Sequence, residues 1–259
     1  TPLYSSAASD VYKRQALYIF PSDMAAMEAA EAVMAGAEVP RTLEFMDAKV
    51  VEGVVLQLGD EARSALGRAV GGGYSVLALE TDAQTEADAL AQLGGIGAVL
   101  AEHGGERIGM TTDRAEALRL WRVRSELSPA CHQFGEYKIN DDISVPRDKM
   151  ARFVAGVAEI GREFGLQFLN YGHVGDGNFH VTLMFENEDD PRLEQGWRAI
   201  ERTCALALEL GGTLTGEHGI GISKAHLLRL QRDATFVELC RGIRQAFDPH
   251  GIMNPGKWL

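Results

Sequence analysis

Hydrophobic and polar residues alternate with clear periods in the second half of the chain. In the segment 148–164 the apolar residues recur at helical spacing and fall on one face; they are Met150, Phe153, Val154, Val157, Ile160 and Phe164. In Asn178–Phe185 every second residue is apolar, which is the period of a strand. Phe179 and Val181 then face a core, and His180 and Thr182 face the opposite side.

The same reading predicts regular elements along the rest of the chain. In the first half, the expected elements are a strand Ala16–Phe20, a helix from Ser22 or Asp23 to Ala35, a strand Arg41–Met46, a helix Asp60–Val70, a strand Tyr74–Glu80 and a helix Asp82–His103. In the second half they are a linking helix Asp113–Leu127, a strand Asp142–Val145, the helix Asp148–Phe164, the strands Leu166–Tyr171 and Asn178–Phe185, and a helix Pro191–Leu210, followed by a tail that is helical to Phe247.

Strands and helices interleave in both halves, and the second half reads as a βαββα unit. We therefore predict an α+β fold of two ferredoxin-like βαββα units. These would form a largely antiparallel sheet with helices on one face, followed by a helical C-terminal segment.

The length and composition fit one large domain. The chain has 259 residues, and 46% of them are hydrophobic, enough to form a core. Thr1–Gln15 is polar and aperiodic, so we expect a non-native or disordered tail there and the domain itself from residue 16 to 259.

Charge and cysteine content narrow the class of protein. The formal net charge is −12, which argues against a nucleic-acid partner. No apolar run approaches the ~20 residues that span a bilayer, so direct membrane insertion is not expected. The three cysteines Cys131, Cys204 and Cys240 are too scattered for a disulfide framework, which favours the cytoplasm.

The stretch Tyr171–Val181 contains two histidines on either side of an Asp176-Gly177 pair. Asp-Gly between strands indicates a two-residue hairpin turn. That turn would place His173 directly opposite His180, with Cβ atoms ~5 Å apart, where both imidazoles could reach one metal ion. Two ordinary surface histidines flanking a hairpin explain this stretch equally well.

Two further stretches combine glycine with polar residues. Residues 211–221 hold five glycines around Glu217-His218, yet they match neither a phosphate-binding loop nor a dinucleotide-binding turn. A carboxylate and an acid/base group there could serve a site, or the segment could simply connect helices. The end of the chain, from Phe247 to Leu259, contains Asn254-Pro-Gly-Lys and cannot be helical.

Together, in this order and spacing, the three stretches resemble the C-terminal domain of FAD-linked oxidases of the vanillyl-alcohol oxidase superfamily. The resemblance runs from about Ala16 to Leu259 and includes Leu43–Asp47 and Trp121–Arg124. It is strongest to the glycolate oxidase flavoprotein subunit and to D-lactate and D-2-hydroxyglutarate dehydrogenases.

This resemblance implies a set of site residues. His173, His180 and Glu217 would bind a divalent metal, and two nitrogens with one carboxylate suit Zn, Mn or Fe(II). His218 would be the catalytic base. The FAD would be held mostly by an N-terminal lobe that this sequence does not contain.

The resemblance also implies substrate and cofactor contacts. Arg124, Lys138 and Thr182 would bind the substrate, and Asn178 and Asn254 would contact the FAD. Taken alone, Arg124 could instead pair with Glu126 on the surface, and Lys138, beside Glu136 and Tyr137, carries the same alternative.

The implied function is that of the substrate- and metal-binding lobe of an FAD-dependent 2-hydroxyacid dehydrogenase. Its partners would be a small 2-hydroxyacid, an electron-acceptor protein or quinone, and an FAD-binding chain or iron–sulfur subunit, which could hold it at the inner membrane. Two alternatives remain open at this point: a stand-alone metal-dependent hydrolase, and a non-catalytic interaction lobe.

Overall fold

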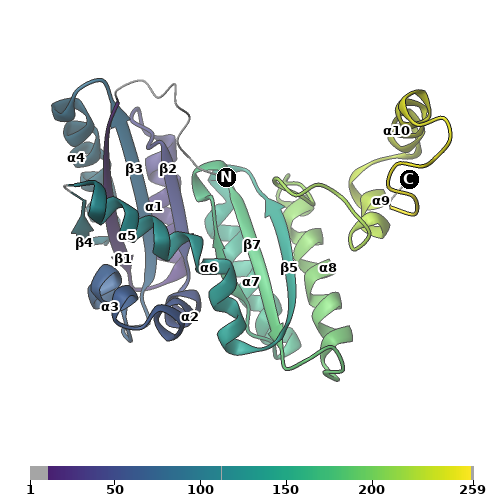
Figure 1. Ribbon diagram of the computed structural model, residues 1–259, viewed down its shortest axis with the longest axis horizontal. Helices are drawn as coiled ribbons and strands as arrows, with labels where there is room; N and C mark the ends of the chain where they lie inside the picture. The colour runs from purple at the N-terminus through teal and green to yellow at the C-terminus, as the bar shows by residue number, and fades with distance from the viewer. Residues whose placement is uncertain (1–10, 112, 258–259) are drawn as a thin grey trace.

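A single antiparallel sheet forms the centre of the fold (Figure 1). The computed structural model describes residues 11–111 and 113–257. Within them the strand order is β4-β1-β3-β2-β6-β7-β5. The first four strands come from the first half of the chain and the last three from the second half, and the two groups join where β2 pairs with β6. The predicted α+β class with an antiparallel sheet is confirmed.

The bounds of the elements are as follows. The strands are β1 Tyr12–Phe20, β2 Thr42–Met46, β3 Ser75–Ala83, β4 Glu106–Met110, β5 Tyr137–Ser144, β6 Leu169–Gly172 and β7 Asn178–Phe185. The α-helices are α1 Asp23–Ala35, α2 Ala48–Leu58, α3 Asp60–Leu66, α4 Glu86–Glu102, α5 Arg114–Ser125, α6 Leu127–Ala130, α7 Met150–Phe164, α8 Leu193–Glu209, α9 Leu228–Gln231 and α10 Ala234–Phe247.

Helices cover both faces of the sheet, which corrects the expectation of one covered face. One core lies between the sheet and α1, α4, α7 and α8, and it takes in Phe153 and Phe179. A second core lies on the other face under α2, α3, α5 and α6, and it takes in Val54 and Tyr171. In Figure 1, α5 and α6 cross in front of the strands. The second layer matters for function because it brings α5 and α6 to the same face as His180.

Strand β1 is longer than the sequence analysis predicted, and helix α2 was not among the predicted elements. Strand β1 begins at Tyr12, so the last residues of the polar stretch Thr1–Gln15 belong to the fold, and Gln15 is buried. Residues 1–10 of that stretch lie outside the described part of the chain. Helix α2 was not predicted, because its valines and Gly53 have low helix propensity. Its amphipathic packing and the Asp47 cap, which accepts from the Val50 N–H at 2.7 Å, outweigh that preference.

The predicted hairpin register was wrong by two residues. Tyr171, not His173, lies opposite His180, because a 3₁₀ turn at Val174–Asp176 lengthens the connection. Since side chains alternate with a period of two, this shift leaves His173 on the same face as His180. The two imidazole ring centres are 5.6 Å apart. The prediction that His173 and His180 lie close together is therefore confirmed, although the predicted register was wrong.

Gly177 ends this turn in a left-handed conformation, with φ of 70°. A Cβ atom there would come within 2.2 Å of the Val145 carbonyl oxygen. We expect Gly177→Ala to lower the free energy of unfolding by about 2 kcal/mol or more, measured by urea denaturation. Gly104→Ala is the matched control, because Gly104 has φ of 82° with nothing within 4 Å of the added atom. Equal losses in both variants would show that the carbonyl contact does not matter.

The C-terminal segment, residues 234–257, begins with helix α10 and lies apart from the sheet (Figure 1). Helix α10 contains no buried residue, and the segment exposes large apolar side chains at Phe236, Leu239, Ile243, Phe247, Ile252 and Met253. Among the residues that the structure describes, no helix is both long and apolar enough to cross a membrane.

Candidate metal centre and its polar surroundings

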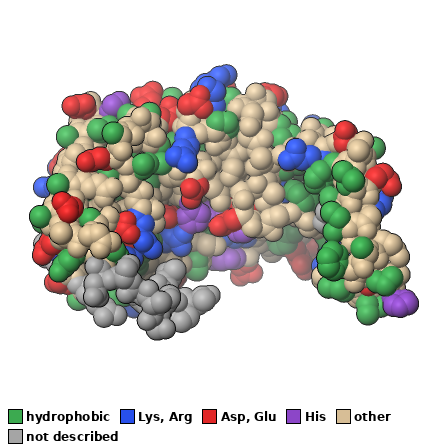
Figure 2. All heavy atoms as spheres, turned by 90° about the horizontal axis from the view of Figure 1, so that it is seen from above, with side chains coloured by type: hydrophobic (Ala, Val, Ile, Leu, Met, Phe, Trp, Pro, Cys, Tyr) green, Lys and Arg blue, Asp and Glu red, His purple; other side chains and the backbone are tan. Residues whose placement is uncertain are grey.

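The candidate site is built on positions of four neighbouring strands that point to the same face of the sheet. On β7, His180 and Thr182 pair across the sheet with Asp142 and Asn140 of β5. On the other side, Tyr171 of β6 lies opposite His180, and Met46 of β2 lies opposite Tyr171. Alternation along each strand therefore brings Glu44, His173, His180 and Asp142 to one face. Figure 2 shows histidine, acidic and basic side chains meeting near the middle of the surface above these strands.

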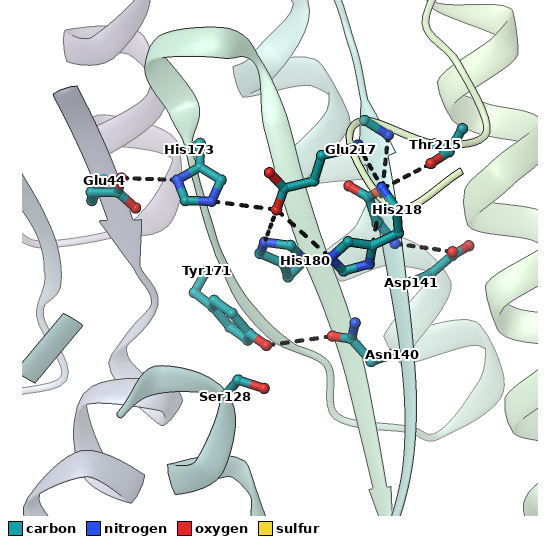
Figure 3. Close-up of polar contacts among 12 residues, drawn as sticks. Glu44, Ser128, Asn140, Asp141, Tyr171, His173, His180, Thr215, Glu217 and His218 are labelled. Atoms are coloured by element: carbon teal, nitrogen blue, oxygen red, sulfur yellow. Dashed lines mark hydrogen bonds and ion pairs between the residues drawn. The ribbon is translucent and has the colours of Figure 1, made fainter. Parts of the chain in front are cut away.

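His173, His180 and Glu217 converge as a group that could hold a metal ion (Figure 3). Glu217 Oε1 lies 3.6 Å from His173 Nε2 and 3.7 Å from His180 Nε2. All three ligand atoms lie within 4.8 Å of one another. Two ligands bonded to one Zn²⁺ at ~2.1 Å lie roughly 3–4 Å apart, so only small movements separate this arrangement from a coordinated one. The donor set and its spacing therefore fit a divalent metal.

The two histidines differ in their environments. His180 is buried, and burial together with the neighbouring His173 lowers its pKa to about 4. It is therefore neutral at pH 7, the form that binds a metal. His173 Nδ1 lies 2.9 Å from Glu44 Oε1, and this hydrogen bond raises the His173 pKa despite partial burial. With Nδ1 bonded to Glu44, Nε2 is the ring nitrogen that faces Glu217.

His218 lies beside the three candidate ligands. Its ring stacks on His180 with the centres 5.4 Å apart, and its Nε2 is 3.7 Å from Glu217 Oε1. The side chain is 54% exposed. His218 also forms a second group of ligand atoms with Asp142 and His180. An exposed imidazole next to a metal site is suited to take a proton from a bound ligand.

Arg124 reaches the site from α5. Its Nη2 lies 3.1 Å from both ring nitrogens of His173, and its Nε is 3.4 Å from Glu44 Oε2. The alternative surface ion pair between Arg124 and Glu126 does not form, because the Glu126 carboxylate accepts a hydrogen bond from the Gln57 side chain instead. Arg124 and His173 also line a cavity of about 980 Å³, which leaves room for a ligand beside them.

Lys138 belongs to a separate polar group on the far side of Tyr171. Its ammonium donates to Ser128 Oγ at 2.7 Å and lies 3.5 Å from the Tyr171 hydroxyl. Burial lowers the pKa of Lys138. A partly desolvated ammonium next to two hydroxyl groups is suited to anchor a carboxylate. Its position near Ser128 and Tyr171 was not anticipated from the sequence.

Thr182 is fully buried, and its hydroxyl donates to Asn140 Oδ1 at 2.7 Å. The Asn140 side chain also lies 3.5 Å from the Tyr171 hydroxyl, as drawn in Figure 3. Asn140 is exposed where Thr182 is not. On this strand pair, the residue that faces the open side is therefore Asn140, and Thr182 lies behind it.

The two asparagines expected to contact FAD lie in different environments. Asn178 is buried, and its side chain packs against Gly216, where an added Cβ would come within 2.6 Å of it. Asn254 is exposed in the segment after α10. Asn178 thus lies under the segment that carries Glu217, whereas Asn254 belongs to the exposed C-terminal segment.

Glu44 and Asp142 are site residues that the sequence analysis missed. Both are buried acids, with 5% and 1% exposure, and both bond to the segments that carry the candidate ligands. A charged residue inside an otherwise apolar strand, such as Glu44 in β2, was the available signal.

The chain is similar in sequence to known proteins along most of its length. The family described as FAD linked oxidases, C-terminal domain, matches residues 11–258. The glycolate oxidase subunit GlcD of Bacillus subtilis is 28% identical over 245 residues, covering 95% of this chain and 50% of that protein. An uncharacterized FAD-linked oxidoreductase of Mycobacterium tuberculosis is 30% identical over 244 residues, covering 89% of the chain and 48% of that protein. A probable mitochondrial D-lactate dehydrogenase of Danio rerio is 30% identical over 165 residues, covering 61% of the chain and 32% of that protein.

Solved structures share the fold. Substrate-bound p-cresol methylhydroxylase superposes with a TM-score of 0.68 at 10% identity, covering 95% of this chain and 52% of that one. An alkyldihydroxyacetonephosphate synthase gives 0.62 at 11% identity, covering 95% and 44%. At such identities the likeness concerns architecture alone. The chain spans about half the length of the curated relative from Bacillus subtilis.

Proposed function

Because the chain belongs to the family of FAD-linked oxidase C-terminal domains, we propose that it is the substrate- and metal-binding lobe of an FAD-dependent 2-hydroxyacid dehydrogenase. The observation that carries the proposal is the convergence of His173, His180 and Glu217, with His218 beside them and Arg124 within reach. Family membership supports the flavin, and the names of relatives, glycolate oxidase and D-lactate dehydrogenase, favour a small 2-hydroxyacid.

The site residues would have separate roles in the oxidation of a 2-hydroxyacid to a 2-oxoacid. A metal held by His173, His180 and Glu217 would lower the pKa of the substrate hydroxyl. His218 accepts the hydroxyl proton at its exposed ring. The hydride from C2 requires the flavin as acceptor, which is the redox chemistry that FAD supplies.

Cationic side chains on both sides of the histidines favour an anionic substrate. The planar guanidinium of Arg124 can bind a carboxylate through two parallel hydrogen bonds. Lys138 offers a second positive charge beyond Tyr171, and its contacts with Ser128 fix the position of the ammonium. The overall charge of −12 makes such a local positive region necessary for an acid to approach.

The test supplies an FAD-binding lobe to the metal-loaded chain and follows loss of flavin absorbance under anaerobic conditions. We expect glycolate or D-lactate to reduce the flavin, and acetate or propionate, which lack the hydroxyl group, to leave it oxidised. Removal of the metal with a chelator should stop the reduction. If no 2-hydroxyacid reduces the flavin in the metal-loaded protein, the proposed substrate class is wrong.

Electron acceptors and association with other chains follow from the same proposal. Reduced FAD must pass its electrons to an acceptor, for which an electron-transfer protein or a quinone would serve. In Figure 2 an open space separates the C-terminal segment from the rest of the molecule, and exposed apolar side chains of the segment lie on the side that faces this space. A partner such as an FAD-binding chain or an iron–sulfur subunit would have apolar surface available there.

Glu44 should raise the metal affinity of the site through its hydrogen bond with His173. We expect Glu44→Gln to weaken Zn²⁺ binding about 10- to 100-fold, because the carboxylate that orients the ring and raises its basicity is lost. Isothermal titration of the chain with Zn²⁺ measures the change. Glu86→Gln is the control, since Glu86 is an exposed acid that pairs with Arg14 away from the histidines. Unchanged affinity in Glu44→Gln would mean that Glu44 serves only to pair with Arg124.

A further inference from the structure

The loop that carries Glu217 and His218 has no regular secondary structure of its own. Residues 214–220 form bends and irregular backbone, and the side chains of Glu217 and His218 are each about half exposed. A metal ligand and a base need fixed positions to act together. Contacts with the sheet must therefore hold this loop in place.

A single buried carboxylate oxygen accepts hydrogen bonds from four donors of the loop. Asp142 Oδ2 lies 3.0 Å from the Gly216 amide nitrogen, 2.8 Å from that of Glu217 and 2.7 Å from that of His218. The hydroxyl of Thr215 donates to the same oxygen at 2.8 Å. The Asp142 side chain is fully buried, and its other oxygen, Oδ1, has no hydrogen-bond partner among the described residues. Within residues 11–111 and 113–257, the carboxylate is therefore bonded only to this loop.

The neighbouring residue of β5 holds the other end of the segment from the opposite face. Successive strand residues point to opposite faces, so Asp141 faces the core beneath α8. Asp141 Oδ1 pairs with Lys224 Nζ at 2.5 Å, in a buried ion pair. The same ammonium donates to the Leu214 carbonyl at 2.6 Å and to the Asp142 carbonyl at 3.1 Å. Lys224 thereby closes residues 214–224 into a loop fixed on strand β5.

We propose that Asp142 is a positioning residue, which holds the amides of Gly216, Glu217 and His218 so that Glu217 completes the metal site and His218 lies beside it. The position of Asp142 supports this, because it lies directly across the strand pair from His180. Strand β7 thus supplies the candidate ligand His180. Strand β5 supplies Asp142, which anchors the loop that carries the candidate ligand Glu217. The role in metal binding rests on the proposed function, whereas the anchoring of the loop does not.

The first measurement is amide hydrogen exchange of Gly216, Glu217 and His218 in the chain without metal. We expect these amides to be protected in the wild type and to exchange at least about tenfold faster in Asp142→Ala, with a smaller change in Asp142→Asn, which keeps a neutral acceptor. The exposed Asp189→Asn is the control. Protection of the core amides of α7 in all variants would show that the fold is intact. Exchange at the same rate in Asp142→Ala and wild type would overturn the proposal.

The second measurement is titration of the same proteins with Zn²⁺. A folded Asp142→Asn chain should bind Zn²⁺ about 10- to 100-fold more weakly than the wild type, the size expected for a residue that acts through a ligand. Equal affinity would overturn the positioning role. If the wild type binds no Zn²⁺ at all, the proposed metal-binding function fails, and the exchange rates still decide whether Asp142 holds the loop.

Discussion

A chain with His180 replaced by alanine is expected to lose divalent metal binding by at least about 100-fold. The imidazole of His180 is the most enclosed of the candidate ligands, and its pKa of about 4 keeps it neutral and ready to bind at pH 7. Even residues that only support a ligand contribute about 10- to 100-fold to metal affinity, so removal of a ligand should have a larger effect. Metal content by mass spectrometry and titration with Zn²⁺ measure the loss.

Two further variants make this result interpretable. Glu217→Gln should also lose most of the affinity, and its half-exposed side chain can be changed without disturbing the core. His226→Ala should bind metal like the wild type, because His226 is exposed and pairs with Glu201 away from the site. A wild-type chain that remains folded but takes up no metal would contradict the metal centre. It would favour the alternative of a non-catalytic interaction lobe.

Replacement of His218 with alanine should separate chemistry from metal binding. We expect the rate of flavin reduction by a 2-hydroxyacid to fall about 10²- to 10⁴-fold, the usual contribution of a general base. Metal affinity should change little, because Glu217, His173 and His180 remain. The backbone N–H that donates to Asp142 also remains, so the loop should keep its position.

The rate of flavin reduction by His218→Ala also separates the remaining alternatives. A variant that reduces flavin as fast as the wild type would show that another group takes the proton. Turnover of esters by the metal-loaded chain without any flavin, lost in His218→Ala, would instead point to the hydrolase alternative.

The sequence alone was sufficient for the fold class and for the principal candidate ligands. Periodicity identified β7 and α7 because both are strongly amphipathic, and alternation put Phe179 and Val181 in the core and His180 on the other face. His173 and His180 were also correctly brought together, although their register was not. Alternation tolerates a shift of two residues, which is why a wrong turn still gave the right face.

Only the tertiary structure showed what surrounds those ligands. Helix α2 forms because its valines pack against the sheet, and α5 and α6 then lie on the face that carries His180 and present Arg124 and Ser128 to it. Glu44 and Asp142 also gained their roles through tertiary contacts, with residues at least 73 positions away along the chain. Lys224 gained its role through contacts with strand β5. Local patterns report which face a side chain takes, because that depends on neighbours along the chain. They do not report which distant segment will cover that face, because that depends on packing of the whole fold.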